Sequence, residues 1–188
     1  MVNMMIHINC QNIILGNKGE IKMRMALTGH RPERLGYPEL DFETSSEWRK
    51  VVDWLKEKIL ELNVTDTYCG MATGCDIAYG IATMELNNET SVYKINRPKI
   101  KLHCILPCKN YNRKIKWHKI LKEAADEWVE LSEEFYKGCD NVRDQYMVDH
   151  SDKLFAIWDG NESGGVWSTI KKAQKKNIDI VYYPKEKL

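Results

Sequence analysis

The chain lacks long hydrophobic runs. No window of its 188 residues approaches the roughly 18 uninterrupted apolar residues that a membrane-spanning helix needs. Its first residues also lack the basic start, apolar core and small-residue cleavage site of a secretory signal. We therefore expect a soluble, cytoplasmic protein with no membrane partner.

The chain also lacks an excess of charge of either sign. Its 28 lysine and arginine residues nearly balance 27 aspartate and glutamate residues, which gives a formal net charge of +1. This balance provides no electrostatic footprint for duplex DNA or RNA, because neutralising phosphates requires a basic surface. A nucleic-acid partner is disfavoured, and any site for a polyanion has to be local.

Paired cysteine motifs are missing as well. None of the six cysteines forms a Cys-x-x-Cys pair, and most lie inside apolar or helical runs. This usage argues against a secreted disulfide framework and favours reduced thiols. Cys104 and Cys108 lie near His103 and His118, but their spacing fits no common zinc module. Buried free cysteine is the commoner explanation, so we expect no metal and no other cofactor.

Length and apolar content bound the domain organisation. With 43% hydrophobic residues, the chain suffices for one domain with a substantial core. Residues 1–21 contain two strand-like runs, IHINC and NIILG, with NKG as a turn signal. They predict either an appended hairpin or a ragged extension. We assign residues 1–21 to an N-terminal extension and residues 22–188 to a single domain.

From residue 22 onward, strand patterns alternate with amphipathic helix patterns. We expect strands at residues 23–28, 66–69, 100–106, 127–131, 153–158 and 178–183. Helices are expected at residues 45–62, 76–86, 115–127, 142–150 and 165–176, with Ser45 or Ser46 as a cap and a polar linker over 87–98. This alternation predicts an α/β fold whose mainly parallel sheet is flanked by helices.

Four of the strands are followed by loops that are suited to binding a ligand. These loops read TGHRP, GMATGCD, PCKN and WDGNESGG. Parallel strands point the same way, so their carboxyl ends meet at one edge of the sheet, where open α/β sheets bind ligands. The sequence therefore predicts a site at this edge.

The first loop, TGHRP, ends an apolar run abruptly. Gly29 lets the backbone approach a ligand closely, Arg31 offers a planar fork for phosphate, and His30 is able to hydrogen-bond a ribose or move a proton. No G-x-G-x-x-G follows, so the fingerprint of dinucleotide-binding proteins is absent. The alternative is a solvated turn in which Arg31 pairs with Glu33.

The second loop, GMATGCD, leads into a helix whose free N–H groups are able to hold an anion. Within it, Asp76 either caps the helix as a structural acid or accepts hydrogen bonds from ribose hydroxyls. Neither role is excluded by the sequence.

The last loop places paired glycines, Gly164 and Gly165, before a helix, with Ser168 and Thr169 expected in its first turn. Backbone amides and hydroxyls in this arrangement suit a phosphate cradle, and a plain helix cap is the alternative. The Gly-Lys-Ser/Thr ending of a P-loop is absent, which disfavours hydrolysis of nucleoside triphosphates. Arg143, on the preceding helix, is placed to reach a phosphate.

Five segments together resemble the SLOG superfamily, above all its YpsA-like branch, which is related to the LOG phosphoribohydrolases and the DprA/Smf proteins. The segments are LTGHRP, GMATGCDIAYG, ILPC followed by Trp117, RDQYMVDHSDKLFAIWDG and SGGVWSTIKKA, over about residues 24–183. The resemblance implies a three-layer Rossmann-like fold that binds nucleotides or nucleotide-derived ligands at the carboxyl edge of its sheet. The implied ligand-binding residues are Thr28, Gly29, His30, Arg31, Gly74, Asp76, Arg143, Gly164, Gly165 and Ser168.

The chain departs from the enzymatic branch of this superfamily, which carries Pro-Gly-Gly-x-Gly-Thr-x-x-Glu with the glutamate as catalytic acid. The aligned stretch, SGGVWSTIK, has Trp167 at the third glycine and Lys171 at the glutamate. Glycosidic cleavage needs a carboxylate or its equivalent to handle protons and to stabilise oxocarbenium charge. The departure favours a protein without enzymatic activity, unless His30, Asp76 or Asp149 takes over this role.

Three hypotheses follow. The first is a non-catalytic protein that senses, carries or sequesters a phosphate-bearing nucleotide signal, such as an ADP-ribose derivative or a cyclic nucleotide, since SLOG domains of the binding kind occur in bacterial immune systems. The second is a hydrolase of the N-glycosidic bond of nucleotides, with His30 or Asp76 as acid or base. The third is a DprA-like interaction module for single-stranded DNA or a protein partner.

The resemblance also bears on assembly. The resemblance to SLOG proteins implies a dimer or a tetramer, so we expect a homo-oligomer. Tryptophan-rich helices serve either a partner surface or the core. The residues in question are Trp48, Trp54, Trp117 and Trp128.

Overall fold

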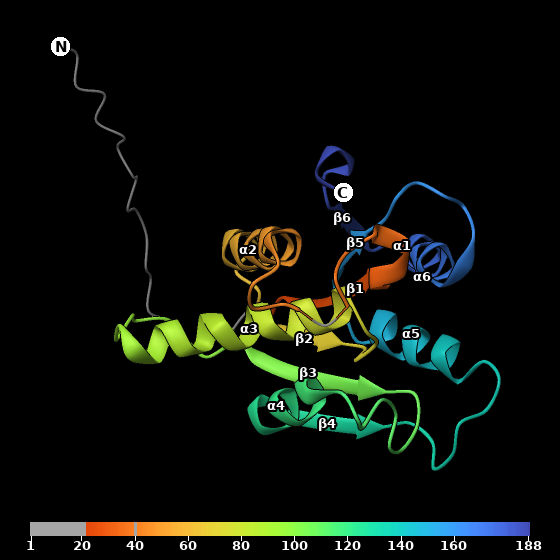
Figure 1. The fold of residues 1–188 in the computed structure, drawn as a ribbon, viewed down its shortest axis with the longest axis horizontal. Helices are drawn as coiled ribbons and strands as arrows, with labels where there is room; N and C mark the ends of the chain where they lie inside the picture. The colour runs from red at the N-terminus through yellow and green to blue at the C-terminus, as the bar shows by residue number, and fades with distance from the viewer. Residues whose placement is uncertain (1–21, 40) are drawn as a thin grey trace, which may run out of the picture.

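The computed structural model of the protein describes residues 22–39 and 41–188. Its centre is a six-stranded sheet in the order β4-β3-β2-β1-β5-β6, in which every neighbouring pair is parallel (Figure 1). The hairpin or extension predicted for residues 1–21 lies outside the described residues. The strands are β1 (Arg24–Gly29), β2 (Asp66–Cys69), β3 (Lys101–Leu106), β4 (Glu127–Glu130), β5 (Lys153–Ile157) and β6 (Asp179–Tyr182).

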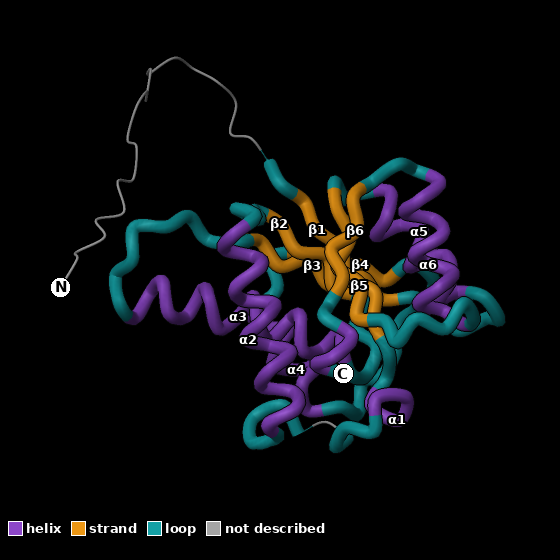
Figure 2. The backbone as a smooth tube through the Cα atoms, turned by 90° about the horizontal axis from the view of Figure 1, so that it is seen from above, coloured by secondary structure: helices purple, strands orange, loops and turns teal. Residues whose placement is uncertain are grey.

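Helices cover both faces of this sheet (Figure 2). The first face carries α2, α3 and α4, and the second carries α5 and α6. The α/β fold with three Rossmann-like layers is thereby confirmed. The helices are α1 (Pro32–Leu35), α2 (Ser46–Glu61), α3 (Cys75–Val92), α4 (Lys116–Ala124), α5 (Cys139–Asp149), α6 (Gly164–Lys175) and the short 3-10 helix η1 (Lys185–Lys187).

Three hydrophobic clusters of the described residues fill the space between the sheet and the helices. Successive side chains of a strand point to opposite faces, so Met25 and Leu27 of β1 pack against α2 and α3, whereas Ala26 packs with Met147 and Leu154 on the other face. The largest cluster lies under α2, α3 and α4. It contains three of the four tryptophans in question, Trp48, Trp54 and Trp117, so these side chains serve the core.

Local capping signals fix the entry to α2. The Ser45 hydroxyl accepts a hydrogen bond from the Trp48 amide at 3.3 Å, which confirms a cap at this position. The segment before it contains α1, which the sequence analysis did not predict. Pro32 in the first turn and Gly36, in the left-handed conformation with a φ of 68°, begin and end this single turn.

One helix boundary was predicted wrongly. α3 continues past residue 86 to Val92, so the first part of the polar linker expected over 87–98 is helical. Tertiary contacts stabilise the polar residues in this last part of α3. The Asn87 side chain donates to the Ile100 carbonyl oxygen at 2.8 Å and accepts from the Ile100 amide at 2.9 Å, while Glu89 pairs with Lys56 of α2. The other predicted elements begin and end within a few residues of the observed bounds.

Two further expectations concern the chain as a whole. The five cysteines in the described part of the chain are free and buried, which agrees with reduced thiols. Over residues 22–39 and 41–188, the structure contains no helix that is long and apolar enough to cross a membrane.

Candidate functional site

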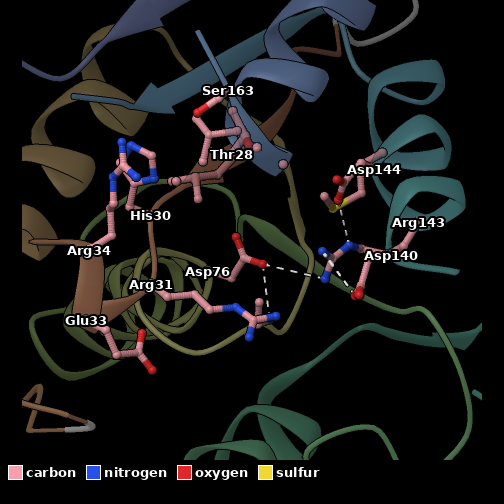
Figure 3. Close-up of a pocket in the computed structure, with 17 residues that line it drawn as sticks. Thr28, His30, Arg31, Glu33, Arg34, Asp76, Asp140, Arg143, Asp144 and Ser163 are labelled. Atoms are coloured by element: carbon pink, nitrogen blue, oxygen red, sulfur yellow. Dashed lines mark hydrogen bonds and ion pairs between the residues drawn. The ribbon is translucent and has the colours of Figure 1, made fainter. Parts of the chain in front are cut away.

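A cleft of about 520 Å³ opens at the carboxyl end of β1, between the loop after β1, the start of α3, the face of α5 and the start of α6 (Figure 3). This is the sheet edge at which the sequence predicted a site. Eight of the ten predicted ligand residues line it, whereas Gly74 and Ser168 do not. The eight are Thr28, Gly29, His30, Arg31, Asp76, Arg143, Gly164 and Gly165.

Gly29 allows β1 to approach α3 closely at the floor of the cleft. A Cβ atom at this position would lie 2.4 Å from the Cβ atom of Cys75, a distance that real side chains do not reach. Gly74 has a related role behind the cleft wall. Its φ is +91°, and a Cβ atom there would lie 2.8 Å from the carbonyl oxygen of His30. Gly74 therefore brings two loops together and does not face the cleft.

His30 and Arg34 form a clamp on Asp159, the residue two positions after the end of β5. The Nε2 atom of His30 lies 3.1 Å from Asp159 Oδ1, and the Arg34 guanidinium lies 2.7 Å from Oδ2. Asp159 also accepts a hydrogen bond from the Asn161 amide at 2.9 Å. Partial burial opposes ionisation, but the bonds from Asn161, Arg34 and His30 outweigh it and lower the pKa of Asp159 to about 2. The clamp ties the loop after β1 to the loop before α6.

The first turn of α6 faces the cleft without a side-chain cap. Its N-cap residue is Ser163, whose hydroxyl donates to Asn161 Oδ1 at 2.8 Å instead of capping the helix. Gly164, with a φ of +79°, and Gly165 have open space where a side chain would lie. Amides at such a helix start attract anions. Ser168, predicted in the first turn, lies in the second turn because α6 begins at Gly164, and its hydroxyl lies 3.4 Å from Asn141 Oδ1.

Arg143 lines the cleft, is almost completely buried, and donates hydrogen bonds within the protein from two of its three side-chain nitrogens. Its Nε atom donates to Asp144 Oδ1 at 2.8 Å, and a terminal nitrogen donates to the Gly70 carbonyl oxygen. The guanidinium also lies 3.7 Å from Asp76 and 3.8 Å from Asp140 (Figure 3). Burial lowers the pKa of Arg143, but Asp144 and Asp76 raise it above its ordinary value, so the side chain stays charged.

Asp76 presents a carboxylate to the cleft from the first turn of α3. Its Oδ2 atom accepts a hydrogen bond from the Ala72 amide at 3.1 Å, so the carboxylate binds the preceding loop and does not cap α3. Burial raises the pKa of Asp76 to about 6, although Arg143 and the Ala72 amide act in the opposite direction. Asp76 therefore titrates close to neutral pH.

Arg31 is the exposed cation of the cleft. Its side chain makes no hydrogen bond and no ion pair with the described residues, so the pairing with Glu33 that the sequence left open is not formed. Figure 3 shows its side chain extending past Asp76 along the mouth of the cleft. A free guanidinium at this place is available to an anionic ligand.

Several residues in the cleft or next to it were missed by the sequence analysis. Asp140 lies three positions before Arg143, and Asp144 lies one position after it. The sequence therefore did show two acidic residues close to an arginine of a predicted helix. Asp159 follows the apolar run of β5 directly, as functional residues at a carboxyl edge do, but its partners His30 and Arg34 are distant in sequence. Only the fold brings this cluster together.

Asp149, offered for catalysis, and Lys171, at the position of the missing glutamate, both lie outside the cleft. Asp149 pairs with Lys176 at 3.7 Å on the exposed end of α5. Lys171, at the position aligned with the catalytic glutamate, points its ammonium over the ring of Trp167 at 5.9 Å. Within the described ranges, no group of three or more histidine, cysteine, aspartate or glutamate side chains is arranged to hold a metal ion.

Comparison with known proteins adds no family assignment. No protein-family model matches the chain, and no curated protein matches it either. The resemblance to the SLOG superfamily stays a prediction, and the function has to be argued from the chemistry of the cleft.

Replacing Arg143 with methionine should destabilise the protein by about 3–5 kcal/mol, because it leaves the carboxylates around it buried and unpaired. Urea unfolding followed by circular dichroism measures this loss. The matched control is Arg24→Met, which breaks an ion pair with Asp152 that is partly exposed to solvent and should cost about 1 kcal/mol or less. Equal losses in both variants would contradict the structural role of Arg143.

Replacing Asp159 with asparagine should lower the free energy of unfolding at pH 7. The pKa of Asp159 is about 2 in the folded protein and roughly 3.9 in an unfolded chain. The carboxylate therefore stabilises the fold above about pH 4, and this contribution is lost as the pH falls to about 2. Urea titrations between pH 2 and 7 should show the two proteins converging at the acid end. Asp179→Asn, which removes an exposed carboxylate paired with Lys153, should show little difference, and a constant gap for Asp159→Asn would argue against the clamp.

Proposed function

We propose that the cleft binds a phosphate-bearing nucleotide derivative, such as an ADP-ribose derivative or a cyclic nucleotide, and that the protein senses, carries or sequesters this ligand without cleaving it. The observation that carries the proposal is the pairing of unused donors with an unused acceptor in one cleft. Arg31 and the uncapped amides of Gly164 and Gly165 are free to bind phosphate. The second oxygen of Asp76, Oδ1, has no hydrogen-bond partner in the described part of the chain.

This distribution fits a ligand with two chemically different ends. Phosphate oxygens accept hydrogen bonds from a guanidinium and from amides at a helix start. Carboxylates accept hydrogen bonds from ribose hydroxyls, as acidic residues do in nucleotide sites. The cleft volume of about 520 Å³ lies within the range of roughly 300–1,000 Å³ that is usual for small-molecule sites.

The engagement of Arg143 refines the roles expected from the sequence. Because its nitrogens already meet Asp144, Asp76 and Gly70, it holds the carboxylates in place. Phosphate recognition then falls to Arg31 and the amides of α6. Ser168 has no part in this recognition, since its hydroxyl lies outside the cleft.

A hydrolase of the N-glycosidic bond is the second candidate, and the state of Asp76 favours it. A buried carboxyl group with a pKa of about 6 that faces a cleft is suited to general acid or base chemistry. His30 is a weaker candidate for this role, because Asp159 engages its Nε2 atom. Lys171 lies over Trp167, outside the cleft, and we assign proton transfer to Asp76 among the cleft carboxyl groups because burial raises its pKa to about 6.

Thermal stabilisation tests ligand binding directly. AMP, ADP-ribose, cyclic ADP-ribose isomers, NAD and cyclic dinucleotides form a suitable panel. A true ligand at 100 times its dissociation constant adds about 2.7 kcal/mol, which corresponds to a rise in Tm of roughly 5–10 °C for a chain of this size. Arg31→Ala should abolish this rise while leaving the ligand-free Tm nearly unchanged, because the exposed Arg31 side chain makes no hydrogen bond and no ion pair with the described residues.

The matched control for Arg31→Ala is Arg113→Ala, another exposed arginine that lies outside the cleft. It should retain the full ligand-induced rise. A rise that survives Arg31→Ala would contradict the proposed phosphate contact. No rise with any compound of the panel would contradict the proposed function and favour an interaction module.

Mass spectrometry of the same samples separates binding from cleavage. The proposed function expects intact ligand after prolonged incubation. Release of a free base would establish the hydrolase instead, and Asp76→Asn should then lower the rate at least 100-fold through loss of acid or base catalysis. Asp149→Asn is the control and should keep the rate, since Asp149 lies outside the cleft. Equal rates for both variants would exclude Asp76 as the catalytic group.

A further inference from the structure

We propose that His118, which does not line the cleft, is a positioning residue for Asp76. It holds the peptide of Met71 so that the Ala72 amide donates its hydrogen bond to the Asp76 carboxylate. The inference rests on the proposed function, because Asp76 belongs to the cleft assigned above. It adds a residue of α4 to a site that is otherwise built from β1, α1, α3, α5, α6 and the loops beside them.

His118 is buried, with 4% of its surface exposed. Its Nε2 atom lies 2.8 Å from the Met71 carbonyl oxygen. A carbonyl oxygen only accepts hydrogen bonds, so Nε2 carries the proton in this contact. Burial lowers the pKa of His118, although the bond to Met71 acts against this shift. The ring is therefore neutral at pH 7, with its proton on Nε2.

The second ring nitrogen of His118 is unusual. Nδ1 is buried and has no hydrogen-bond partner among the described residues. An unpaired buried polar atom costs free energy, and an apolar ring of similar size would avoid this cost. The contact between Nε2 and Met71 is the one hydrogen bond of the imidazole in the described structure, so the polar role of this side chain lies in that contact.

Met71 has a backbone conformation that needs support. Its φ of 60° lies in the left-handed region, which is uncommon for a residue with a side chain. The Met71 side chain is fully buried beside the thiol of Cys69, and the carbonyl is bound by His118. Residues in such conformations persist when their surroundings fix them. The turn at Met71 directs the following amide, that of Ala72, toward Asp76 at 3.1 Å.

The loop between β2 and α3 is thus held at two successive carbonyl groups. Arg143 of α5 binds the Gly70 carbonyl oxygen from one side of the sheet, and His118 of α4 binds the Met71 carbonyl oxygen from the other. The next amide, Ala72, is then left to bind Asp76. The two helices on opposite faces of the sheet together fix one hydrogen bond to the carboxylate.

The charges that face Asp76 come from other elements. Arg143, Asp144 and Asp140 face it from α5, and Arg31 faces it from the loop after β1. His118 itself is faced by the rings of Tyr111 and Trp128. Substituting His118 therefore removes no charge around Asp76 and acts on the carboxylate through the Met71–Ala72 peptide, while Tyr111, which lies near both His118 and Asp76, keeps its hydroxyl. This separation makes the inference testable through the titration of Asp76.

The test is the pKa of Asp76 in the ligand-free protein, measured by carbon-13 NMR of its carboxyl group. His118→Phe removes the donor to Met71 and should raise the pKa of Asp76 by about one unit, the effect of losing one hydrogen bond to a charged group. His118→Gln keeps a terminal N–H donor at similar reach and should restore the wild-type value. Circular dichroism verifies that both variants are folded.

An unchanged pKa in folded His118→Phe would overturn the inference, as would a His118→Gln variant that behaves like His118→Phe. If His118→Phe does not fold, His118→Asn takes its place, because its amide is too short to reach Met71 and should give the same rise. The ligand panel remains a separate measurement. A shifted pKa of Asp76 without any ligand binding would contradict the proposed function and support the positioning role of His118. Ligand binding without a pKa shift would support the proposed function and contradict the positioning role.

Discussion

The buried guanidinium of Arg143 is the constraint on which the cleft depends. It joins α5 to the loop after β2 through the Gly70 carbonyl oxygen and to α3 through Asp76. A buried cation is tolerated only where carboxylates and carbonyl oxygens surround it, and the cluster of Asp76, Asp140 and Asp144 satisfies that condition. The position of Asp76 follows from this arrangement, whereas its titration near neutral pH comes from burial, which raises its pKa against the opposing effect of Arg143.

A second ion-pair cluster shapes the opposite side of the cleft. Asp159 engages His30 and Arg34, so these two side chains of the first loop hold the backbone that precedes α6. Arg31, between them in sequence, is left without a partner in the described structure. The basic residues of this segment thereby divide between holding the cleft wall and leaving one exposed guanidinium in the cleft. This division explains how a chain with a net charge of +1 presents a local positive charge there.

The fold could be predicted to a large extent from the sequence. The periodicities that separate strands from helices depend on local burial, and they placed the strands and most helices correctly. They failed where distant contacts decide the outcome. Asn87 and Glu89 are polar residues typical of a linker, yet they are helical because Ile100 and Lys56 hold them. The single turn of α1 was missed because it is too short to show a period.

The sequence by itself determined the parallel α/β sheet, the edge at which its loops gather and eight of the ten residues expected in the cleft. Strand direction and the positions of glycines and polar loops are local properties, and parallel pairing brings the loops to one edge. Only the tertiary structure decided which of these side chains are free. Arg31 and Arg143 are chemically equal in the sequence, but one faces solvent and the other is enclosed by carboxylates from α3 and α5. Partners distant in the chain set this difference, and no local pattern encodes them.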